Sequence, residues 1–434
     1  AAGDPDAQRC EADTGTGVLL QRSFGSAACV LGRNWGYDEQ GVWVSEGCSG
    51  VFLVPLQEPE SAQPDERWGF LDPGKGFLLG SGPIGELSLS VYALVRYINQ
   101  MPPDQTFDDH LGRERPVDTR QDIWSQRVLV WLTGWVGVPK LKYQVGFWAL
   151  NATGDSRLFG NIGYEFNKHF RLWGGIYGNP SSRSLLGSHP YWLAHDRVMA
   201  DEFFRAFFSQ GIYANGEIVP GLFYNVSMGN SSSSLGNTAL ELDREFTYGG
   251  SVWWMPTTKE FGPRGGYGDW EMHEKLATRF GVSASRSPEQ RFKDVGEDPT
   301  NTTLKLVDSV NLFETGSLAP GVTVTFADYE LLAVDAGLKY RGIFLQTEFY
   351  WRTLDGFKAD GPLPVSEIED WGFYVQAAFY PIPKKLELYG ATSQIYGDKD
   401  AGFGDASEYL VGLNWYLSNS RNNRINLQLI DVNR

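Results

Sequence analysis

Several features are scarce in this chain of 434 residues. It has no run of about 18 apolar residues, which excludes a membrane-spanning helix. Lysine and arginine number 37 against 53 aspartates and glutamates, for a net charge of −16. Because contacts with nucleic-acid phosphates need lysine and arginine, this balance argues against a nucleic-acid partner. The sequence also lacks a nucleophile elbow, a phosphate-binding loop and a complete zinc motif, so we expect no enzymatic activity, no cofactor and no metal.

Cysteine is rare and confined to the start of the chain, at Cys10, Cys29 and Cys48. This pattern is typical of an oxidising compartment and of a small disulfide-stapled module, although the odd count leaves one thiol over. The chain opens without a charged and apolar leader, as expected if a secretory signal has been removed. We predict a module over residues 1–55, a linker rich in Pro, Glu and Asp over 56–76, and one large domain over 77–434.

Aromatic residues (14%) and glycine (51 residues) are abundant. From residue 83 onward the sequence has the repeating pattern of many strands separated by turns. The segments 87–97, 141–147, 276–286, 343–352 and 425–429 alternate apolar residues with polar or small ones. Such alternation indicates strands with one apolar face, as in a transmembrane barrel or in a sandwich. The number of strands and their aromatic ends favour the barrel, with which the mean hydropathy of −0.30 is compatible.

The links between these strands alternate in length. Short links occur at 137–140, 167–169, 339–342 and 381–384, and long polar links at 101–120, 179–201, 229–245, 287–325 and 354–369. Transmembrane barrels have tight periplasmic turns and long outer loops in this order. The segment 256–273 is an exception, because it is long where the order predicts a tight turn.

Counting strands by this order gives about fifteen, whereas bacterial barrels have even numbers. The last run, 424–434, goes in the same direction as the first. We therefore expect that the natural chain continues past Arg434 through a loop and one strand; a misread strand is the alternative. The predicted fold is all-β: a 16-stranded antiparallel transmembrane β-barrel, its last strand absent here, behind a small β-rich disulfide module.

The predicted barrel region, 77–434, resembles the phosphate-selective (O/P-type) porin family in the order and spacing of its motifs. These motifs are Gly85-Glu86-Leu87-Ser88-Leu89-Ser90-Val91-Tyr92, Asp201-Glu202-Phe203-Phe204-Arg205, and the segments 95–97, 125–127, 130–134, 220–226, 335–342, 382–389 and 412–416. The resemblance implies a homotrimer of sixteen-stranded barrels in a bacterial outer membrane, in contact with lipid and lipopolysaccharide. It also implies an outer loop that folds inward and narrows each pore.

The opening block resembles a small bacterial cysteine module of unassigned function. The resemblance is carried by Cys29-Val30-Leu31-Gly32-Arg33-Asn34-Trp35-Gly36-Tyr37-Asp38 and by 41–44 with Gly47-Cys48. It implies a Cys29–Cys48 disulfide. Cys10 would then pair with a cysteine further upstream.

The candidate pore constriction is the long link 179–201, at the position of the family's inward loop. It contains Arg183, His189, Tyr191, Trp192, His195, Asp196 and Arg197. A positive cluster in a narrow, low-dielectric neck attracts anions, and arginine offers a planar fork for phosphate or carboxylate. The alternative is an ordinary outer loop with scattered charges.

Strand alternation also directs six cations into the lumen, where they avoid the cost of facing lipid: Arg96, Arg127, Lys142, Arg279, Lys339 and Arg352. For each of them the alternative is an ion pair with a wall carboxylate such as Glu165, Glu348 or Glu387. Eight tryptophans near strand ends are candidates for an aromatic girdle, or else pack inside the lumen or between subunits: Trp131, Trp135, Trp148, Trp173, Trp253, Trp254, Trp351 and Trp415.

Two functions follow from these patterns. The first is passive diffusion of small hydrophilic solutes, anionic ones in particular, such as phosphate-like ions or carboxylates. The second is a structural role, in which the barrel tethers a periplasmic module that binds the cell wall, a carbohydrate or a protein.

Overall fold

The structure is a computed structural model of the chain. It describes residues 7–12, 14, 18–38, 40–53, 76–102, 104–117, 119–150, 155–187, 191–231, 245–263, 265–418 and 420–434. The chain forms two compact units, Ala1–Asp65 and Glu66–Arg434. Apart from Gly76, the predicted linker 56–76 lies outside the described residues, so its assignment stays a prediction. Among the described helices none is long and apolar enough to cross a membrane.

The first unit is a small β module with its own core. Strand β4 (Gly41–Val44) pairs with β1 (Gln8–Cys10) and β3 (Trp35–Asp38), and β2 (Leu19–Ser23) pairs with β5 (Gly50–Leu53). Val18, Trp35, Val42 and Cys48 form the buried cluster. The predicted disulfide between Cys29 and Cys48 is confirmed, and Cys10 is exposed with a free thiol.

Loss of this disulfide is expected to destabilise the module strongly. The bond closes a chain separation of 19 residues, and a loop of that size corresponds to about 3 kcal/mol of unfolding free energy. We expect Cys29→Ser/Cys48→Ser to expose the module to limited proteolysis at temperatures where the unmodified chain resists. Cys10→Ser is the matched control. Equal resistance of the two variants would contradict a stabilising role for the disulfide.

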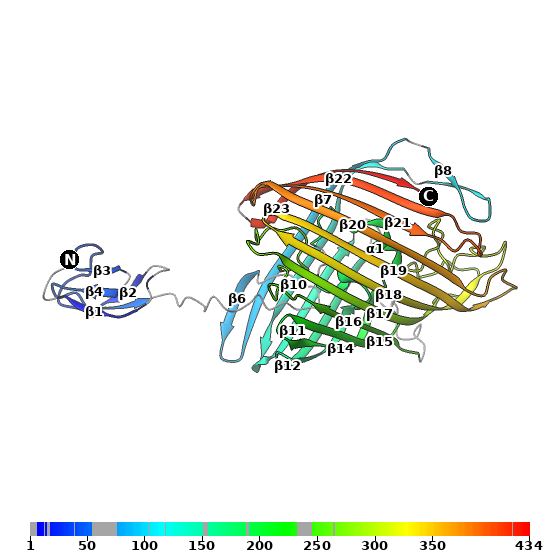
Figure 1. The fold of residues 1–434 in the computed structure, drawn as a ribbon. Helices are drawn as coiled ribbons and strands as arrows, with labels where there is room; N and C mark the ends of the chain where they lie inside the picture. The colour runs from blue at the N-terminus through cyan, green and yellow to red at the C-terminus, as the bar shows by residue number, and fades with distance from the viewer. Residues whose placement is uncertain are drawn as a thin grey trace. The chain divides into compact units, whose positions relative to one another are not determined.

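The second unit is built on one 16-stranded antiparallel sheet (Figure 1). In chain order its strands are β6 (Phe77–Gly82), β7 (Gly85–Asn99), β10 (Gln121–Val136), β11 (Val138–Leu150), β12 (Asp155–Asn167), β13 (Phe170–Gly178), β14 (Phe208–Val219), β15 (Leu222–Gly229), β16 (Thr247–Trp254), β17 (Ala277–Gln290), β18 (Val324–Tyr340), β19 (Ile343–Ala359), β20 (Ile368–Ile382), β21 (Leu386–Tyr396), β22 (Asp405–Ser418) and β23 (Ser420–Asn433). Each strand pairs with its sequence neighbour in this series.

The predicted sixteen-stranded antiparallel sheet is confirmed, but its sixteenth strand is β6. The count of about fifteen omitted β6 because the run 77–82 does not alternate apolar and polar residues. The prediction that one strand is absent from this sequence is therefore corrected in favour of a misread strand count. That the natural chain extends past Arg434 stays a prediction.

The outward face of the sheet is apolar. On β17, Phe280 and Val282 are about half exposed, whereas Arg279 before them and Ser283 after them are buried. The same alternation runs along the other long strands, where it leaves exposed Val91, Val95, Phe147, Leu158, Ile212, Val252, Leu332, Val334, Leu345, Phe349, Val411, Leu427 and Leu429. An apolar band of this extent is far larger than a soluble monomer exposes, and it is the signature of a lipid-facing surface.

The tryptophans divide between the two faces of the sheet. Trp254, Trp351 and Trp415 are exposed on the outer face, as a girdle requires. Trp131, Trp148, Trp173 and Trp253 are buried instead, so the girdle prediction is wrong for these four. The reason is strand parity: Trp253 lies between the outward Val252 and Trp254 and must therefore point inward.

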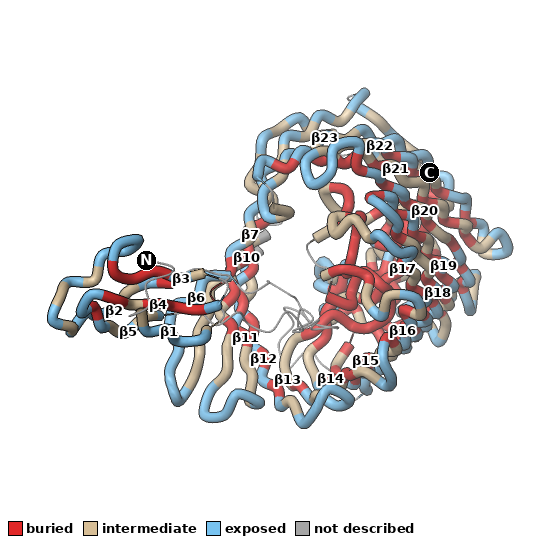
Figure 2. Tube along the Cα trace, turned by 60° about the vertical axis from the view of Figure 1, so that its left-hand side comes forward, coloured by how far each residue is buried: buried red, intermediate tan, exposed pale blue. Residues whose placement is uncertain are grey.

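Three links fold back inside the curve of the sheet. They are 179–207 between β13 and β14, 255–276 between β16 and β17, and 291–323 between β17 and β18. Figure 2 shows buried segments of chain inside the curve, against β16 to β21. The link 179–207 contains a 3-10 turn, Arg183–Leu185, and helix α1 (Met199–Phe204), which packs against β19, β20 and β21. Helix α1 thus extends this link beyond the predicted end at residue 201, and β14 begins only at Phe208.

A small hairpin of β8 (Thr106–Asp108) and β9 (Glu114–Pro116) in the link 100–120 docks on the link 291–323. His110 Nδ1 lies 2.8 Å from the Asp308 carboxylate, and Arg115 Nη1 donates to Glu314 Oε1 at 2.7 Å. The links of this end of the sheet thus contact one another as well as the strands.

Candidate functional site: the constriction loop

The link 179–207, which we call the constriction loop, is closed at its base by a backbone hydrogen bond between its first and last residues. The backbone N–H of Asn179 donates to the carbonyl of Phe207 at 3.0 Å, where the loop leaves β13 and enters β14. Within the loop, the hydroxyls of Ser182 and Ser184 donate to Asp201 at 3.2 and 2.8 Å. These contacts hold the start of the loop against the start of α1.

The wall of the barrel holds the middle of the loop. At the start of α1 the backbone N–H of Met199 donates to Glu408 Oε1 at 3.0 Å, and that of Ala200 to Ser393 Oγ at 2.7 Å. Wall side chains therefore accept the first N–H groups of the helix, which have no acceptor within it. Because these bonds attach the start of α1 to β21 and β22, the loop crosses the lumen away from its own strands.

The loop tip reaches strands near both ends of the sheet. On β23, Arg424 donates to the carbonyls of Leu193 and Ala194, and Gln428 accepts from the backbone N–H of His195 at 3.1 Å. His195 Nε2 lies 3.1 Å from Arg96 Nη1 on β7. One histidine thus contacts the edge strand β23 and also β7, which lies beside the other edge strand, β6, so the sheet curls round toward itself.

The tip is surrounded by more positive than negative charge. Arg127 on β10 donates to Asp196 Oδ2 at 2.9 Å, and Asp196 is the loop carboxylate at this point. In the part of the chain that the structure describes, Nε and Nη1 of Arg127 and Nε of Arg96 have no hydrogen-bond partner. We call Arg96, Arg127, Arg424 and His195 the basic arc.

Two groups of the loop tip have pKa values that differ from their usual ones. Burial together with Arg96 and Arg127 lowers the pKa of His195, so this imidazole is neutral at neutral pH. Burial raises the pKa of Asp196, but Arg127 and Arg197 outweigh it and the net pKa is lowered. At neutral pH the charged groups of the basic arc are therefore the guanidiniums of Arg96, Arg127 and Arg424, with the Asp196 carboxylate beside them.

Two predicted filter arginines are placed elsewhere. Arg183 is 1% exposed, and its backbone N–H donates to Glu348 Oε1 at 2.9 Å. Arg197 has a side chain 4% exposed, packed over the Trp192 ring and 3.4 Å from Asp201. Their prediction as lining groups is corrected, because both guanidiniums anchor the loop and are not presented to a solute. His189 lies outside the described residues.

The wall cations point inward, but three of the six are covered. Arg279, Lys339 and Arg352 are at most 1% exposed, because the inward links lie over them. Arg279 pairs with Asp335 at 2.9 Å, Lys339 with Glu271 at 3.5 Å, and Arg352 with Asp370. Their assignment to the open pore surface is therefore corrected in favour of the ion-pair alternative.

Lys142 also pairs with a wall carboxylate, Glu165, at 3.7 Å, with both side chains about one-fifth exposed. The other two suggested carboxylates have different partners. Glu348 accepts from the hydroxyls of Tyr350 and Tyr374, and Glu387 from Asn414 and Tyr416.

Sequence reasoning missed Arg424. The signal was present: Ile425, Leu427 and Leu429 were assigned to the outward face, so Arg424, Asn426 and Gln428 had to point inward. The role of the link 255–276 was also missed, because a long segment in the place of a tight turn does not itself reveal where it packs.

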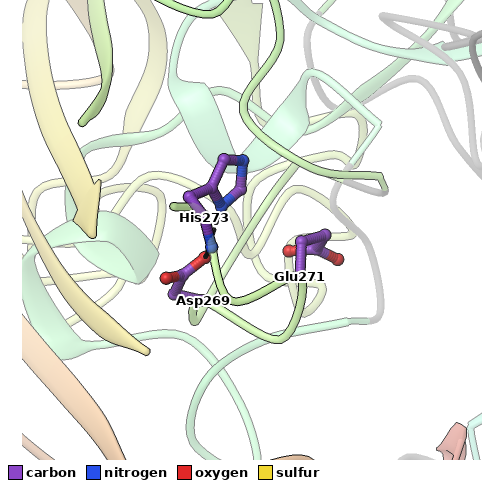
Figure 3. A group of neighbouring side chains, drawn as sticks. All are labelled: Asp269, Glu271 and His273. Carbon is purple, nitrogen blue, oxygen red and sulfur yellow. Dashed lines mark hydrogen bonds and ion pairs between the residues drawn. The ribbon is translucent and has the colours of Figure 1, made fainter. Parts of the chain in front are cut away.

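A cluster of Asp269, Glu271 and His273 lies in the link 255–276 (Figure 3), with one ligand-type atom of each within 4.8 Å of the others. His273 Nδ1 contacts Asp269, and its Nε2 lies 2.7 Å from Glu260 Oε1. Glu271 faces Lys339 at 3.5 Å and Arg421 at 3.8 Å. Because neighbouring protein groups already satisfy the donors and two cations adjoin them, we assign the cluster to ion pairing rather than to a metal.

The His273 contacts are expected to give the link a dependence on alkaline pH. Burial lowers the pKa of His273, but its hydrogen bonds with Asp269 and Glu260 outweigh burial and raise the pKa to about 9. Stabilisation by the charged imidazole is thus complete below about 6.5 and is lost as pH rises through about 9. We expect amide hydrogen exchange of 256–275, corrected for intrinsic rates, to accelerate above pH 9. His273→Gln should remove that step, and a step unchanged in this variant would contradict the assignment.

The comparisons with known proteins concern both units. Residues 1–64 match the family described as "Protein of unknown function (DUF3011)". The chain is similar to the solved structure of OmpT, an outer membrane protein of Vibrio cholerae in trimer form, at 12% identity and a TM-score of 0.51, over 80% of this chain and 89% of that one. No curated protein matches the sequence.

Two further solved structures are similar at lower scores. An anion-selective porin from Comamonas acidovorans has 13% identity and a TM-score of 0.42, over 77% of this chain and 85% of that one. OprB of Pseudomonas putida has 11% identity and a TM-score of 0.42, over 80% and 89%. The sheet topology and the likeness to OmpT define the class of fold, a porin-type β-barrel.

Proposed function

We propose that the chain is an outer-membrane porin for passive diffusion of small hydrophilic anions, phosphate-like or carboxylate, of the phosphate-selective type. The observation that carries the proposal is the basic arc, which lies where an inward-folded loop meets the wall of a barrel with an apolar outer face. The apolar band supports a lipid-embedded barrel and hence an outer-membrane location.

The geometry of the arc supports attraction of anions. Charges beside low-dielectric walls act over longer distances than in bulk water and raise the local concentration of the opposite charge. The donors of Arg127 and Arg96 that lack protein partners are themselves buried, so these guanidiniums act on a passing anion through their charge and not through direct hydrogen bonds. The negative charge of Asp196 weakens the attraction of the arc for anions. Transport requires such a limit, because a solute that binds too tightly does not leave the pore.

The oligomeric state belongs to the proposal as well. A homotrimer fits the family resemblance, and the related OmpT structure is a trimer form. Part of the outward apolar surface would then be covered by neighbouring subunits. Chemical cross-linking of the detergent-solubilised protein tests this arrangement.

The direct test of channel function is incorporation of the purified full chain into planar lipid bilayers. We expect discrete conductance steps of uniform size. Absence of steps, with protein shown by flotation to be in the membrane, would rule out the channel.

A second function is favoured by the first unit, which is compact and has its own disulfide and core. We propose that this module is periplasmic and binds an envelope component, a cell-wall polymer, a carbohydrate or a protein, so that the barrel serves as its anchor. Co-sedimentation of the full chain with isolated cell-wall material, compared with a variant lacking residues 1–65, tests the first of these ligands.

A further inference from the structure

The link 255–276 differs from every other described connection at its end of the barrel. The remaining connections there contain one to three residues, as between Val136 and Val138 or between Tyr340 and Ile343. This one has over twenty residues and folds into the lumen, where Phe261 and Asp269 are fully buried. Such a segment is not needed to reverse the chain direction, because two residues suffice for a hairpin.

The link is attached to the wall along most of one side of the barrel. Asp269 Oδ2 accepts from the backbone N–H of Gly342 at 2.7 Å, between β18 and β19. The Trp270 ring packs edge-on against Tyr416, with centroids 4.6 Å apart. Arg421, at the start of β23, donates to the carbonyl of Tyr267. The link thus crosses from β17 to β23 on the inner face.

Close backbone packing supports this placement. Gly268 has a φ of +70°, and a Cβ there would lie 2.2 Å from Glu387 Oε1. A larger residue at this position would therefore both strain the backbone and push the link away from the wall.

The inner side of the link contacts the constriction loop through Arg183. The Arg183 Nη2 donates to the carbonyl of Gly265 at 2.5 Å. Its guanidinium lies over the Tyr267 ring at 4.7 Å and over the Phe261 ring at 5.4 Å. Trp192 of the loop meets Tyr267 edge-on, with centroids 6.0 Å apart. The loop and the link, which enter from opposite ends of the barrel, therefore meet in the lumen.

We propose that residues 255–276 form an internal peg that fixes the constriction loop in position and so sets the size limit of the pore, with Arg183 as the positioning residue that joins the two. The inference rests on the proposed channel function. The peg stops the loop from moving toward the opposite end of the barrel, because Arg183 is enclosed by peg rings on one side and by the wall carboxylates Asp335 and Glu348 on the other.

Two variants test the peg in the full chain. In the first, residues 256–275 are replaced by Asn-Gly, a tight hairpin turn. In the second, Arg183→Gln removes the charge that holds the peg rings. The matched control is Arg205→Gln: Arg205 is also buried and in the same loop, but it contacts Glu202, Ala206 and Phe207 of that loop.

We expect both peg variants to have a higher unitary conductance and to admit larger polyethylene glycols than the unmodified chain, while Arg205→Gln keeps the original limit. Unchanged conductance and polymer limit in Arg183→Gln, for protein with native heat-modifiable migration on gels, would overturn the proposal. An equal widening in Arg205→Gln would also overturn it, because general loosening of the loop would then explain the effect. Failure of the proposed function is distinct, since the unmodified chain would give no conductance steps.

Discussion

Replacement of Arg96 and Arg127 by glutamine is expected to abolish the preference of the channel for anions. These two guanidiniums contact the loop tip at His195 and Asp196 and contain the donors without protein partners. At about 8 Å, with an effective dielectric constant between about 20 and 80, one unit charge changes the energy of a passing ion by about 0.5 to 2 kcal/mol. Each loss therefore lowers the local anion concentration by about twofold to about thirtyfold.

The measurement is the permeability ratio of chloride to potassium in planar bilayers, for the double variant and for Arg286→Gln. Arg286 is on the outer face of β17 with its side chain 64% exposed, so the control removes a positive charge outside the lumen. We expect the ratio to collapse only in the double variant. A similar change in the two proteins would show that the overall charge, and not the basic arc, determines selectivity.

Asp335→Asn is expected to destabilise the barrel by about 3–5 kcal/mol, the cost of leaving a buried charge without its partner. Asp335 Oδ1 lies 2.9 Å from Arg279 Nε and 3.9 Å from Arg183 Nε, and all three side chains are at most 2% exposed. The substitution thus removes the negative charge that faces the buried guanidiniums of Arg279 and Arg183.

Glu330→Gln is the control for Asp335→Asn. Glu330 is on the same strand and pairs with Arg286 at 3.4 Å, but its side chain is 54% exposed. An exposed pair contributes at most about 1 kcal/mol. Guanidinium-induced unfolding in detergent micelles, followed by tryptophan fluorescence, measures both variants. Equal midpoints would contradict the assignment of Asp335 as the buried partner of Arg279.

The architecture of the barrel was largely predictable because it depends on local sequence patterns, namely the alternation of residues along strands and the lengths of the links. Alternation along strands such as β17 determines which side chains share a face, and it correctly directed Arg279 and Arg352 inward. The order of short and long links predicted the strand sequence, and β6 was missed only because its run lacks alternation. The disulfide followed from a resemblance in the cysteine block.

The constriction was predictable only in part. Periodicity tells which face a residue occupies but not what covers that face, and so it could not show that Lys339 and Arg352 lie beneath inward links. The anchoring role of Arg183 depends on a segment some eighty residues further along the chain. Of the predicted basic residues, His195, Arg96 and Arg127 lie at the loop tip, and Arg424 joins them.

The zero-current potential of the full chain across a planar bilayer with a tenfold gradient of KCl tests the central claim most directly. A channel governed by the basic arc has a higher permeability for chloride than for potassium, and its zero-current potential takes the sign set by the chloride gradient. A potential of the opposite sign, set by the potassium gradient, would contradict the account.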